Sequence, residues 1–389
     1  MKNDQLWLDD LKVLDLSRLL PGPFCTLLLA DMGADVLKIE STTGGDYARY
    51  YPPMTDGDGE FGAFFAGLNR NKRSLTLNLK DERAVEIIGK LVAEADVLVE
   101  SFRPGVMDRL GLGYETLSEI NEGLIFCSIS GYGQTGPMRT RAGHDLNYVA
   151  RAGLLDQNGR SGESPVVPGF QVADIAGGAL YAALGILGAL YSRERTGQGS
   201  HVDISMTEGA MSLHLPVHSA LSAGQPQKRG EGMLTGGLPC YNVYETKDGE
   251  HLAVGPLEPK FWMGFVQAIG APELAGDGMS KGEQGEKTRQ KVAEVLGEKT
   301  LKEWLSIFAE VDVCVEPVRS PAEALEDELF EARQMFFTLA GVHQTRTPLT
   351  PKEREHTPAP TLGEHTDEVL GEAGLSGDEI EKLRDEGVV

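Results

Sequence analysis

The chain has 389 residues, which gives room for about two or three domains and a sizeable core, so a small protein held together by disulfides is excluded. Hydrophobic residues make up 41% and charged residues 24% of the chain, and this ordinary globular composition excludes disorder of the whole chain. The formal net charge of −23 argues against a dedicated nucleic-acid-binding protein, because such proteins need a surplus of Lys and Arg.

Strand and helix patterns alternate through the first 130 residues. Strands are predicted at 11–16, 35–40, 74–79, 96–101 and 124–130, and helices at 21–32 and 82–93. This succession predicts an α/β fold with a mostly parallel, Rossmann-like sheet and helices on both faces. Ligands bind such sheets beyond the carboxyl ends of the strands.

Residues 172–191 form an apolar stretch in which Asp174 is the only charge, and it is long enough to span a membrane. Several glycines interrupt it, namely Gly177, Gly178, Gly185 and Gly188. These glycines, and an acid near the start, favour a buried helix of a soluble core. No membrane contact is therefore expected.

The second half of the chain changes character. A Gly-, Gln- and Pro-rich stretch predicts a linker, the patterns at 241–245 and 251–255 predict a hairpin, and 301–308 predicts an amphipathic helix. We expect a large α/β domain to begin with 1–213, a linker at 214–232, a smaller α+β domain at 233–325, and a return to the large domain at 326–389.

The cysteines and the N-terminus give expectations about the compartment. Cys25, Cys127, Cys240 and Cys314 form no C-x-x-C pair, so we predict free thiols and no metal site. The first residues lack the apolar stretch of a secretory signal, and a cytoplasmic protein is expected.

Gly131-Tyr-Gly-Gln-Thr-Gly136 is a G-x-G-x-x-G sequence directly after a predicted strand, and Asp156 lies twenty residues beyond it, as in dinucleotide sites. Pro137 follows the last glycine, where that motif needs an apolar helix. A dinucleotide site is therefore disfavoured.

The stretch 69–80 is basic and holds no acid, although the protein as a whole is acidic. Its cations are Arg70, Lys72, Arg73 and Lys80. A run this short can be a solvated face or a local anion site. Arg103 and Arg109, at the end of another predicted strand, add to the same charge and favour a phosphate-bearing ligand.

Four further polar residues stand at predicted helix starts: His144, Asp145, Asp174 and Glu258. Asp145, Asp174 and Glu258 can simply cap their helices, and His144 can have a structural role. Asp174 has an additional possibility, because the free N–H groups and the dipole at the start of a buried helix would keep a carboxylate ionised there.

Taken together, the motifs resemble the family III CoA transferases (the CaiB/BaiF family), a group that also contains alpha-methylacyl-CoA racemases. The resemblance covers nearly the whole chain. It is carried by the segments Leu11-Lys-Val-Leu-Asp-Leu-Ser, Pro21-Gly-Pro23, Asp31-Met-Gly-Ala-Asp-Val-Leu-Lys-Ile-Glu40, Asn69-Arg-Asn-Lys-Arg73, Ser101-Phe-Arg-Pro-Gly105, Gly131-Tyr-Gly-Gln-Thr-Gly-Pro137 and Leu362-Gly-Glu-His-Thr-Asp-Glu368.

The racemase branch of this family is the most similar. Residues 142–148 resemble its catalytic-histidine motif, 173–178 its aspartate motif and 255–261 its glutamate motif. The transferase branch also has an acid at Asp174, as a nucleophile, but it has a glycine-rich loop followed by Gln. Here the corresponding segment, 234–239, has two glycines and no Gln.

The resemblance implies an interlocked homodimer, with Glu258 of one chain opposite His144 of the other. It assigns CoA contacts to Leu77, Asn78, Lys80, Arg103, Arg109, Asp145 and Tyr148. Many racemases carry Arg where this chain has Ser41, which implies that this chain binds the adenine end of CoA differently.

The function implied is a racemase or epimerase that inverts the α-carbon of 2-methyl-branched acyl-CoA thioesters. Two groups on opposite faces of that carbon are needed, and His144 and Asp174 are the expected pair, with Glu258 orienting His144. We expect the enolate oxygen to be held by backbone N–H groups at the start of the Asp174 helix. No metal and no cofactor beyond the CoA moiety of the substrate is expected.

Two alternatives remain. In a CoA transferase, Asp174 would attack the thioester carbonyl and carry the acyl group covalently. The other alternative is a non-catalytic CoA-binding protein. The presence of His, Asp and Glu at the three positions of the catalytic motifs argues against it.

Overall fold

The computed structural model describes residues 6–55 and 61–389, and the first residues, on which the expectation about a secretory signal rests, lie outside that range. The chain divides into two compact units. Unit 1 comprises Met1–Ala152, Phe170–Leu213 and Glu328–Val389, and unit 2 comprises Gly153–Gly169 and His214–Asp327. Residues 153–169 therefore group with unit 2, whereas the sequence placed them in the large domain.

Unit 1 is built on a six-stranded sheet in which every neighbouring pair is parallel. The strand order is β3-β2-β1-β4-β5-β6, so the order reverses between β1 and β4. The strands are β1 (Lys12–Leu16), β2 (Asp35–Glu40), β3 (Lys72–Thr76), β4 (Val97–Glu100), β5 (Ile125–Ser130) and β6 (Ser200–Ser205). The predicted α/β fold with a parallel sheet is confirmed.

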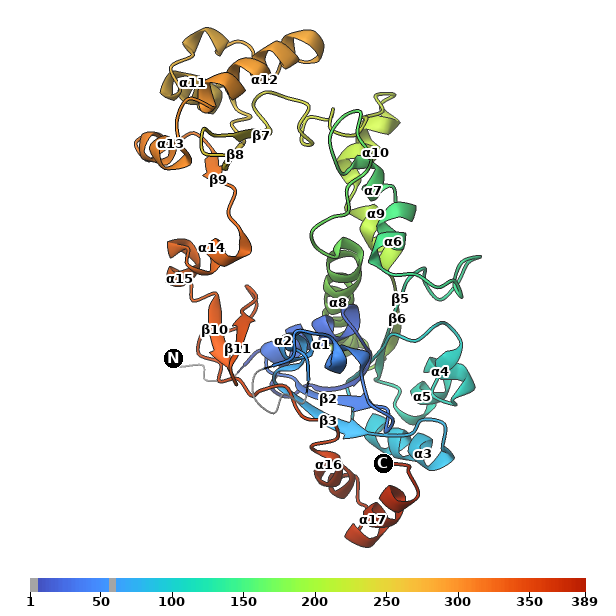
Figure 1. Ribbon diagram of the computed structural model, residues 1–389. Helices are drawn as coiled ribbons and strands as arrows, with labels where there is room; N and C mark the ends of the chain where they lie inside the picture. The colour runs from blue at the N-terminus through green and yellow to red at the C-terminus, as the bar shows by residue number, and fades with distance from the viewer. Residues whose placement is uncertain (1–5, 56–60) are drawn as a thin grey trace. The chain divides into compact units, whose positions relative to one another are not determined.

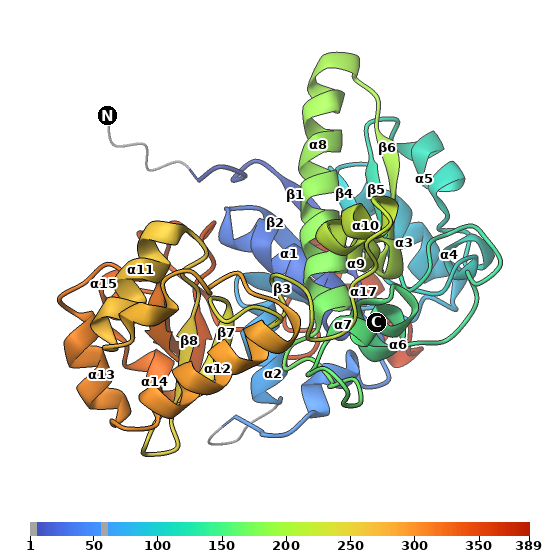
Figure 2. The ribbon, with the colours of Figure 1, turned by 90° about the horizontal axis from the view of Figure 1, so that it is seen from above.

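Helices cover both faces of this sheet. One face carries α1 (Pro21–Asp31) and the long helix α8 (Tyr181–Thr196), which lies along β5 and β6 (Figure 2). The other face packs against α3 (Glu82–Val92), α5 (Tyr114–Ile120), α16 (Thr366–Glu372) and α17 (Gly377–Asp385) in one apolar core. The chain ends on this face, where the Asn78 N–H donates to the Val388 carbonyl at 2.8 Å (Figure 1).

The remaining elements of unit 1 connect these layers. They are η1 (Tyr47–Tyr50), α2 (Ala63–Asn69), α4 (Val106–Arg109), α6 (Asp145–Arg151), η2 (Val172–Leu180), α9 (Met206–Ser212), α15 (Glu328–Ala332), β10 (Phe336–Leu339) and β11 (Val342–Thr345). The π-helix η2 runs directly into α8, and both together form the apolar stretch recognised in the sequence. Gly177 lets η2 approach α9 closely, because a Cβ there would lie 2.7 Å from the Ala210 backbone nitrogen.

Among the described residues one helical run, Val172–Thr196, is long and apolar enough by length and composition to cross a membrane. It packs against α1, β5 and β6 in unit 1. Inside the protein 39% of its apolar part is buried, and one helix of this kind is weak evidence for a membrane span.

Unit 2 holds a three-stranded antiparallel sheet of β7 (Asn242–Glu245), β8 (His251–Val254) and β9 (Val315–Pro317). The predicted hairpin is the β7–β8 pair. Its helices are α7 (Leu154–Gln157), α10 (Leu215–Ser222), α11 (Pro259–Ala268), η3 (Pro272–Leu274), α12 (Gly282–Leu296), α13 (Leu301–Phe308) and α14 (Pro321–Leu325). Trp262, Phe265, Trp304 and Phe308 form its aromatic core. The predicted linker at 214–232 contains α10 and belongs to unit 2.

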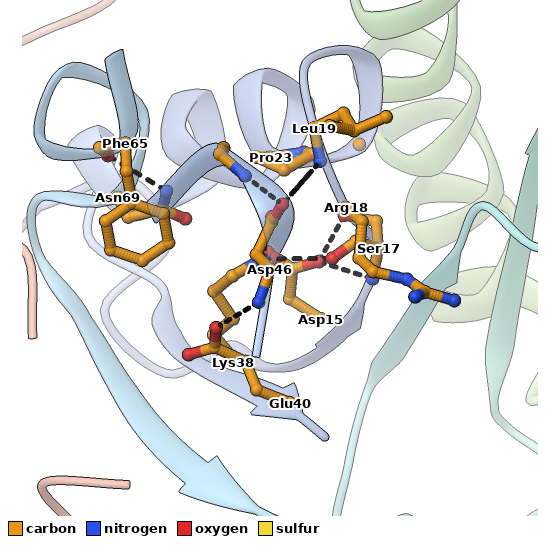
Figure 3. Close-up of polar contacts among 12 residues, drawn as sticks. Asp15, Ser17, Arg18, Leu19, Pro23, Lys38, Glu40, Asp46, Phe65 and Asn69 are labelled. Carbon is orange, nitrogen blue, oxygen red and sulfur yellow. Dashed lines mark hydrogen bonds and ion pairs between the residues drawn. The ribbon is translucent and has the colours of Figure 1, made fainter. Parts of the chain in front are cut away.

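A layer of buried charges lies among β1, β2, β3 and α1 in unit 1 (Figure 3). Lys38 bonds the Ser17 carbonyl at 3.0 Å and Asp46 at 3.2 Å. Lys72 donates to Asp15 at 3.1 Å, and Arg49 pairs with Glu40 at 2.6 Å. Each buried cation thus has a buried acid within bonding distance, as charges removed from water require.

Candidate active site

A large cavity, about 1530 Å³, lies in unit 1 at the carboxyl edge of the parallel sheet. Residues that follow β1, β2, β3, β4 and β5 all line it, including Arg18, Ser41, Lys80, Arg103 and Gly131. It spans the point between β1 and β4 where the strand order reverses. Open parallel sheets bind their ligands at that point.

The cavity wall is basic, although the protein is acidic. Its cations are Arg18, Lys80, Arg103, Arg139 and Arg141, and none of them forms an ion pair with a described residue. Two of the three acids in the wall are already neutralised, Glu40 by Arg49 and Asp46 by Lys38. The cavity therefore suits a ligand with several negative charges.

Five of the seven residues predicted to contact CoA line this cavity: Leu77, Asn78, Lys80, Arg103 and Tyr148. Arg109, on α4, and Asp145, on α6, do not line it. These positions bring most of the predicted set together around one space.

The basic run at 69–80 has a different role from the anion site that the sequence favoured. The Arg70 guanidinium is buried and pairs with Asp31 at 2.5 Å, and Lys72 pairs with Asp15. Arg73 lies outside the cavity and pairs with Asp35 at 2.7 Å. Of the four cations in this run, only Lys80 lines the cavity among the described residues. The interpretation was wrong for the other three because their acid partners come from distant parts of the chain.

Arg18 is a cavity residue that the sequence analysis missed. Its guanidinium carbon lies 5.0 Å from the Phe102 ring centroid and 5.7 Å from that of Tyr47, and all three residues line the cavity. In Figure 3 the guanidinium points away from the Asp15 and Asp46 carboxylates. Its position two residues after β1, at the carboxyl edge of the sheet, was the available signal.

The G-x-G-x-x-G sequence forms a loop that leads toward His144. A Cβ on Gly131 would lie 2.5 Å from the Tyr148 ring, so this glycine makes room for Tyr148. Gly133 and Gly136 have positive φ angles, and no helix follows them. Asp156 lies in unit 2 and pairs with Arg229 at 3.1 Å. The glycines therefore shape a turn, and the dinucleotide interpretation has no support here.

His144 is the residue immediately before α6, and it lines the cavity. Its backbone N–H donates to the Asn147 side chain at 3.0 Å, and the Tyr148 hydroxyl donates to the Gly143 carbonyl at 2.5 Å. These bonds fix the start of the helix on both sides of His144. His144 is an exposed residue in the wall of the cavity.

Asp174 lies in the first turn of η2, is partly buried, and lines the same cavity as His144. Burial, together with the nearby Asp145 carboxylate, raises the pKa of Asp174 to about 7. We expected the helix start to keep this group ionised. The shift has the opposite direction because the carboxyl group is buried and because the Asp145 carboxylate takes up N–H groups at the helix start and adds a second negative charge.

Asp145 accepts hydrogen bonds from two backbone N–H groups of η2, those of Ala173 at 2.7 Å and Asp174 at 3.0 Å, both on the Oδ1 oxygen. These N–H groups were expected to receive an enolate oxygen. They are already bonded to Asp145, so that expectation is not met in this structure.

Glu258 lies in unit 2, immediately before α11, where Pro259 opens the helix. Its side chain makes no cap bond to that helix. The capping role that the sequence allowed is therefore absent, and the carboxylate is available for another role.

Comparison with known proteins adds independent information. The family model described as CoA-transferase family III matches residues 8–366. The chain is 38% identical over 391 residues to alpha-methylacyl-CoA racemase from Homo sapiens, covering 98% of this chain and 97% of that protein. It is 37% identical over 395 residues to succinyl-CoA:mesaconate CoA-transferase from Haloarcula marismortui, covering 95% and 96%. A crystal structure of a CAIB/BAIF family protein from Brucella suis superimposes with a TM-score of 0.83 at 33% identity, covering 95% of this chain and 100% of that one.

Proposed function

Because this chain belongs to CoA-transferase family III, we propose that it is a racemase or epimerase that inverts the α-carbon of 2-methyl-branched acyl-CoA thioesters by proton transfer between two bases. The observation that carries the proposal is the presence of His144 and Asp174 in the wall of one basic cavity. The identity to the human racemase supports the same reaction.

The chemistry needs one group that removes the weakly acidic α-proton and another that returns a proton from the opposite face. In one direction His144 takes the proton and protonated Asp174 delivers one; in the other direction the roles reverse. A carboxyl group with a pKa of about 7 suits both roles near neutral pH, because protonated and ionised forms are both populated. The basic wall suits the CoA phosphates.

The third member of the proposed machinery, Glu258, would come from a second copy of the chain in an interlocked homodimer. Apolar surface on α8 supports a second copy, since Leu184 is 66% and Tyr191 69% exposed there. Placed beside His144, the Glu258 carboxylate would orient the imidazole and favour its charged form. A cytoplasmic location stays a prediction.

A second candidate reaction is CoA transfer between carboxylic acids through an Asp174 acyl intermediate. Transferases among the relatives, such as the one from Haloarcula marismortui, favour it. The segment 234–239 disfavours it, because it lacks the Gln of the transferase branch.

One experiment separates the two reactions. A single enantiomer of a 2-methylacyl-CoA is incubated with the protein in deuterated water, without any free carboxylic acid, and followed by NMR. The racemase proposal expects deuterium at the α-position together with loss of optical purity. An α-proton that stays inert, with turnover only after a carboxylic acid acceptor is added, contradicts it and supports the transferase.

A further inference from the structure

Asp145 connects the two helix starts that carry the proposed acid–base pair. It follows His144 in the chain and opens α6, while its Oδ1 oxygen accepts the N–H groups of Ala173 and Asp174 at 2.7 and 3.0 Å. The bonded segments are 28 and 29 residues apart in sequence. This carboxylate therefore ties the start of η2 to the start of α6 within unit 1.

The contact also changes the charge that Asp174 experiences. Free N–H groups and the positive end of a helix dipole stabilise a carboxylate in the first turn. Here a second carboxylate takes up those N–H groups and places its own negative charge next to Asp174. Two neighbouring carboxylates repel each other, and this repulsion favours the protonated form of one of them.

We propose that Asp145 is a positioning residue for Asp174: one of its oxygens fixes the start of η2, and its negative charge acts on the neighbouring Asp174 carboxyl group. Its role in the family resemblance was a CoA contact, but its side chain is bonded to η2 and does not line the cavity. The effect of Asp145 on the rate of the reaction rests on the proposed function. Its effect on the ionisation of Asp174 does not.

The elements packed against η2 carry other titratable groups. They are Cys25 and Asp31 on α1, Cys127 on β5, His201 and Asp203 on β6, His144, Tyr148 and Arg151 at α6, Glu208 on α9, and Tyr181, Tyr191, Arg193, Glu194 and Arg195 on α8. Burial raises the pKa of Tyr148, so it is neutral and brings no charge. Burial and Asp145 are the two causes that raise the pKa of Asp174. Asp145 is thus the charge to remove.

The test uses Asp145→Asn, which keeps an oxygen acceptor for the two N–H groups but removes the charge. In the free, full-length enzyme labelled with ¹³C at aspartate carboxyl groups, NMR follows the titration of Asp174, whose resonance is assigned by its loss in Asp174→Asn. We expect Asp174 to titrate near pH 7 in the unchanged protein and at least about one pH unit lower in Asp145→Asn. Asp145→Ser, which also offers an oxygen without charge, serves if the Asn variant does not fold.

Kinetics provide the second measurement. The acid limb of the pH profile for α-proton exchange should move to lower pH in Asp145→Asn, while KM for the thioester stays within about twofold. Asp145→Ala, which also removes the acceptor, should lose more kcat than Asp145→Asn. Glu115→Gln removes an exposed charge on α5. It is the matched control and should change neither the titration nor the pH profile.

The possible results distinguish a failure of the proposed Asp145 role from a failure of the proposed reaction. An unchanged Asp174 titration in the uncharged variants overturns the role of Asp145. A raised KM with an unchanged titration instead assigns Asp145 to CoA binding. If the unchanged protein exchanges no α-proton at all, the proposed reaction fails, and the NMR titration still decides the role of Asp145.

Discussion

Two regions of unit 1 are rich in charge and use it in opposite ways. In the buried layer among β1, β2, β3 and α1, each cation has an acid partner, as Lys72 has Asp15. In the cavity at the carboxyl edge, the cations lack such partners among the described residues, as Arg103 does. Charges that are paired inside the protein fix the fold, and charges left unpaired at a cavity are available to a ligand.

The same contrast applies to the carboxylates. Asp31 accepts two bonds from the Arg70 guanidinium, at 3.0 and 2.5 Å, and serves the fold. Asp174 is partly buried and has another acid, Asp145, beside it, so its pKa rises to about 7 and it can exchange protons near neutral pH. Substitutions in one region should therefore change folding stability, and substitutions in the other should change catalysis or binding.

The largest effect is expected at the proposed catalytic residues. His144→Ala should reduce inversion by about 10³-fold or more, since a general acid–base group is lost, and leave the melting temperature unchanged. Glu258→Gln should reduce it by about 10²-fold. Each variant is assayed for α-proton exchange as a purified homodimer.

A mixed dimer of these two variants sharpens the test of the proposed shared site. If Glu258 of one chain serves His144 of the other, one of its two sites is intact, and the mixed dimer should regain about half of the unchanged activity. A mixed dimer as inactive as both homodimers would show that the two residues do not act across the chains. Differently tagged chains, purified through both tags, supply the mixed species.

The next largest effect is expected in the buried layer. Arg70→Met removes a guanidinium that is 1% exposed and leaves the Asp31 carboxylate unpaired in the interior. We expect a loss of about 3–5 kcal/mol in the free energy of unfolding, measured by urea denaturation. Arg139→Met, at an exposed cavity cation, is the control and should leave that free energy unchanged. Equal losses in both variants would contradict the division of roles.

The sequence predicted the local features well because they depend on local patterns. The alternation of apolar residues predicted 35–40 as a strand, and β2 has those bounds. The strand predicted at 74–79 is β3, which begins two residues and ends three residues earlier. The edge strand β6 was missed, although Val202 and Ile204 alternate with polar residues in it. Most of the site residues that the resemblance named line the cavity.

The sequence could not predict which charged side chains pair with one another in the fold. Arg70 and Lys80 belong to one basic run, yet one is paired with Asp31 and the other lines the cavity. What separates them is the fold, which brings an acid from 39 residues away to one and not to the other. Asp145 was misjudged for the same reason, because its bonds reach η2 across 28 residues.

The smallest effect, and the most direct test of the comparison, concerns two arginines that the sequence grouped together. Arg103→Ala should raise KM for the acyl-CoA by about tenfold with little change in kcat, because one charged contact to a bound phosphate is lost uniformly from ground and transition states. Arg73→Ala is the matched control: its guanidinium already pairs with Asp35, Glu368 and Glu372 outside the cavity, so KM should not change. Added salt should weaken binding by the unchanged enzyme more than by Arg103→Ala, since screening acts on the charge that the variant lacks. If KM instead rises in Arg73→Ala, the basic run at 69–80 is the anion site. That result would contradict the distinction between cations paired in the fold and unpaired cations at the cavity.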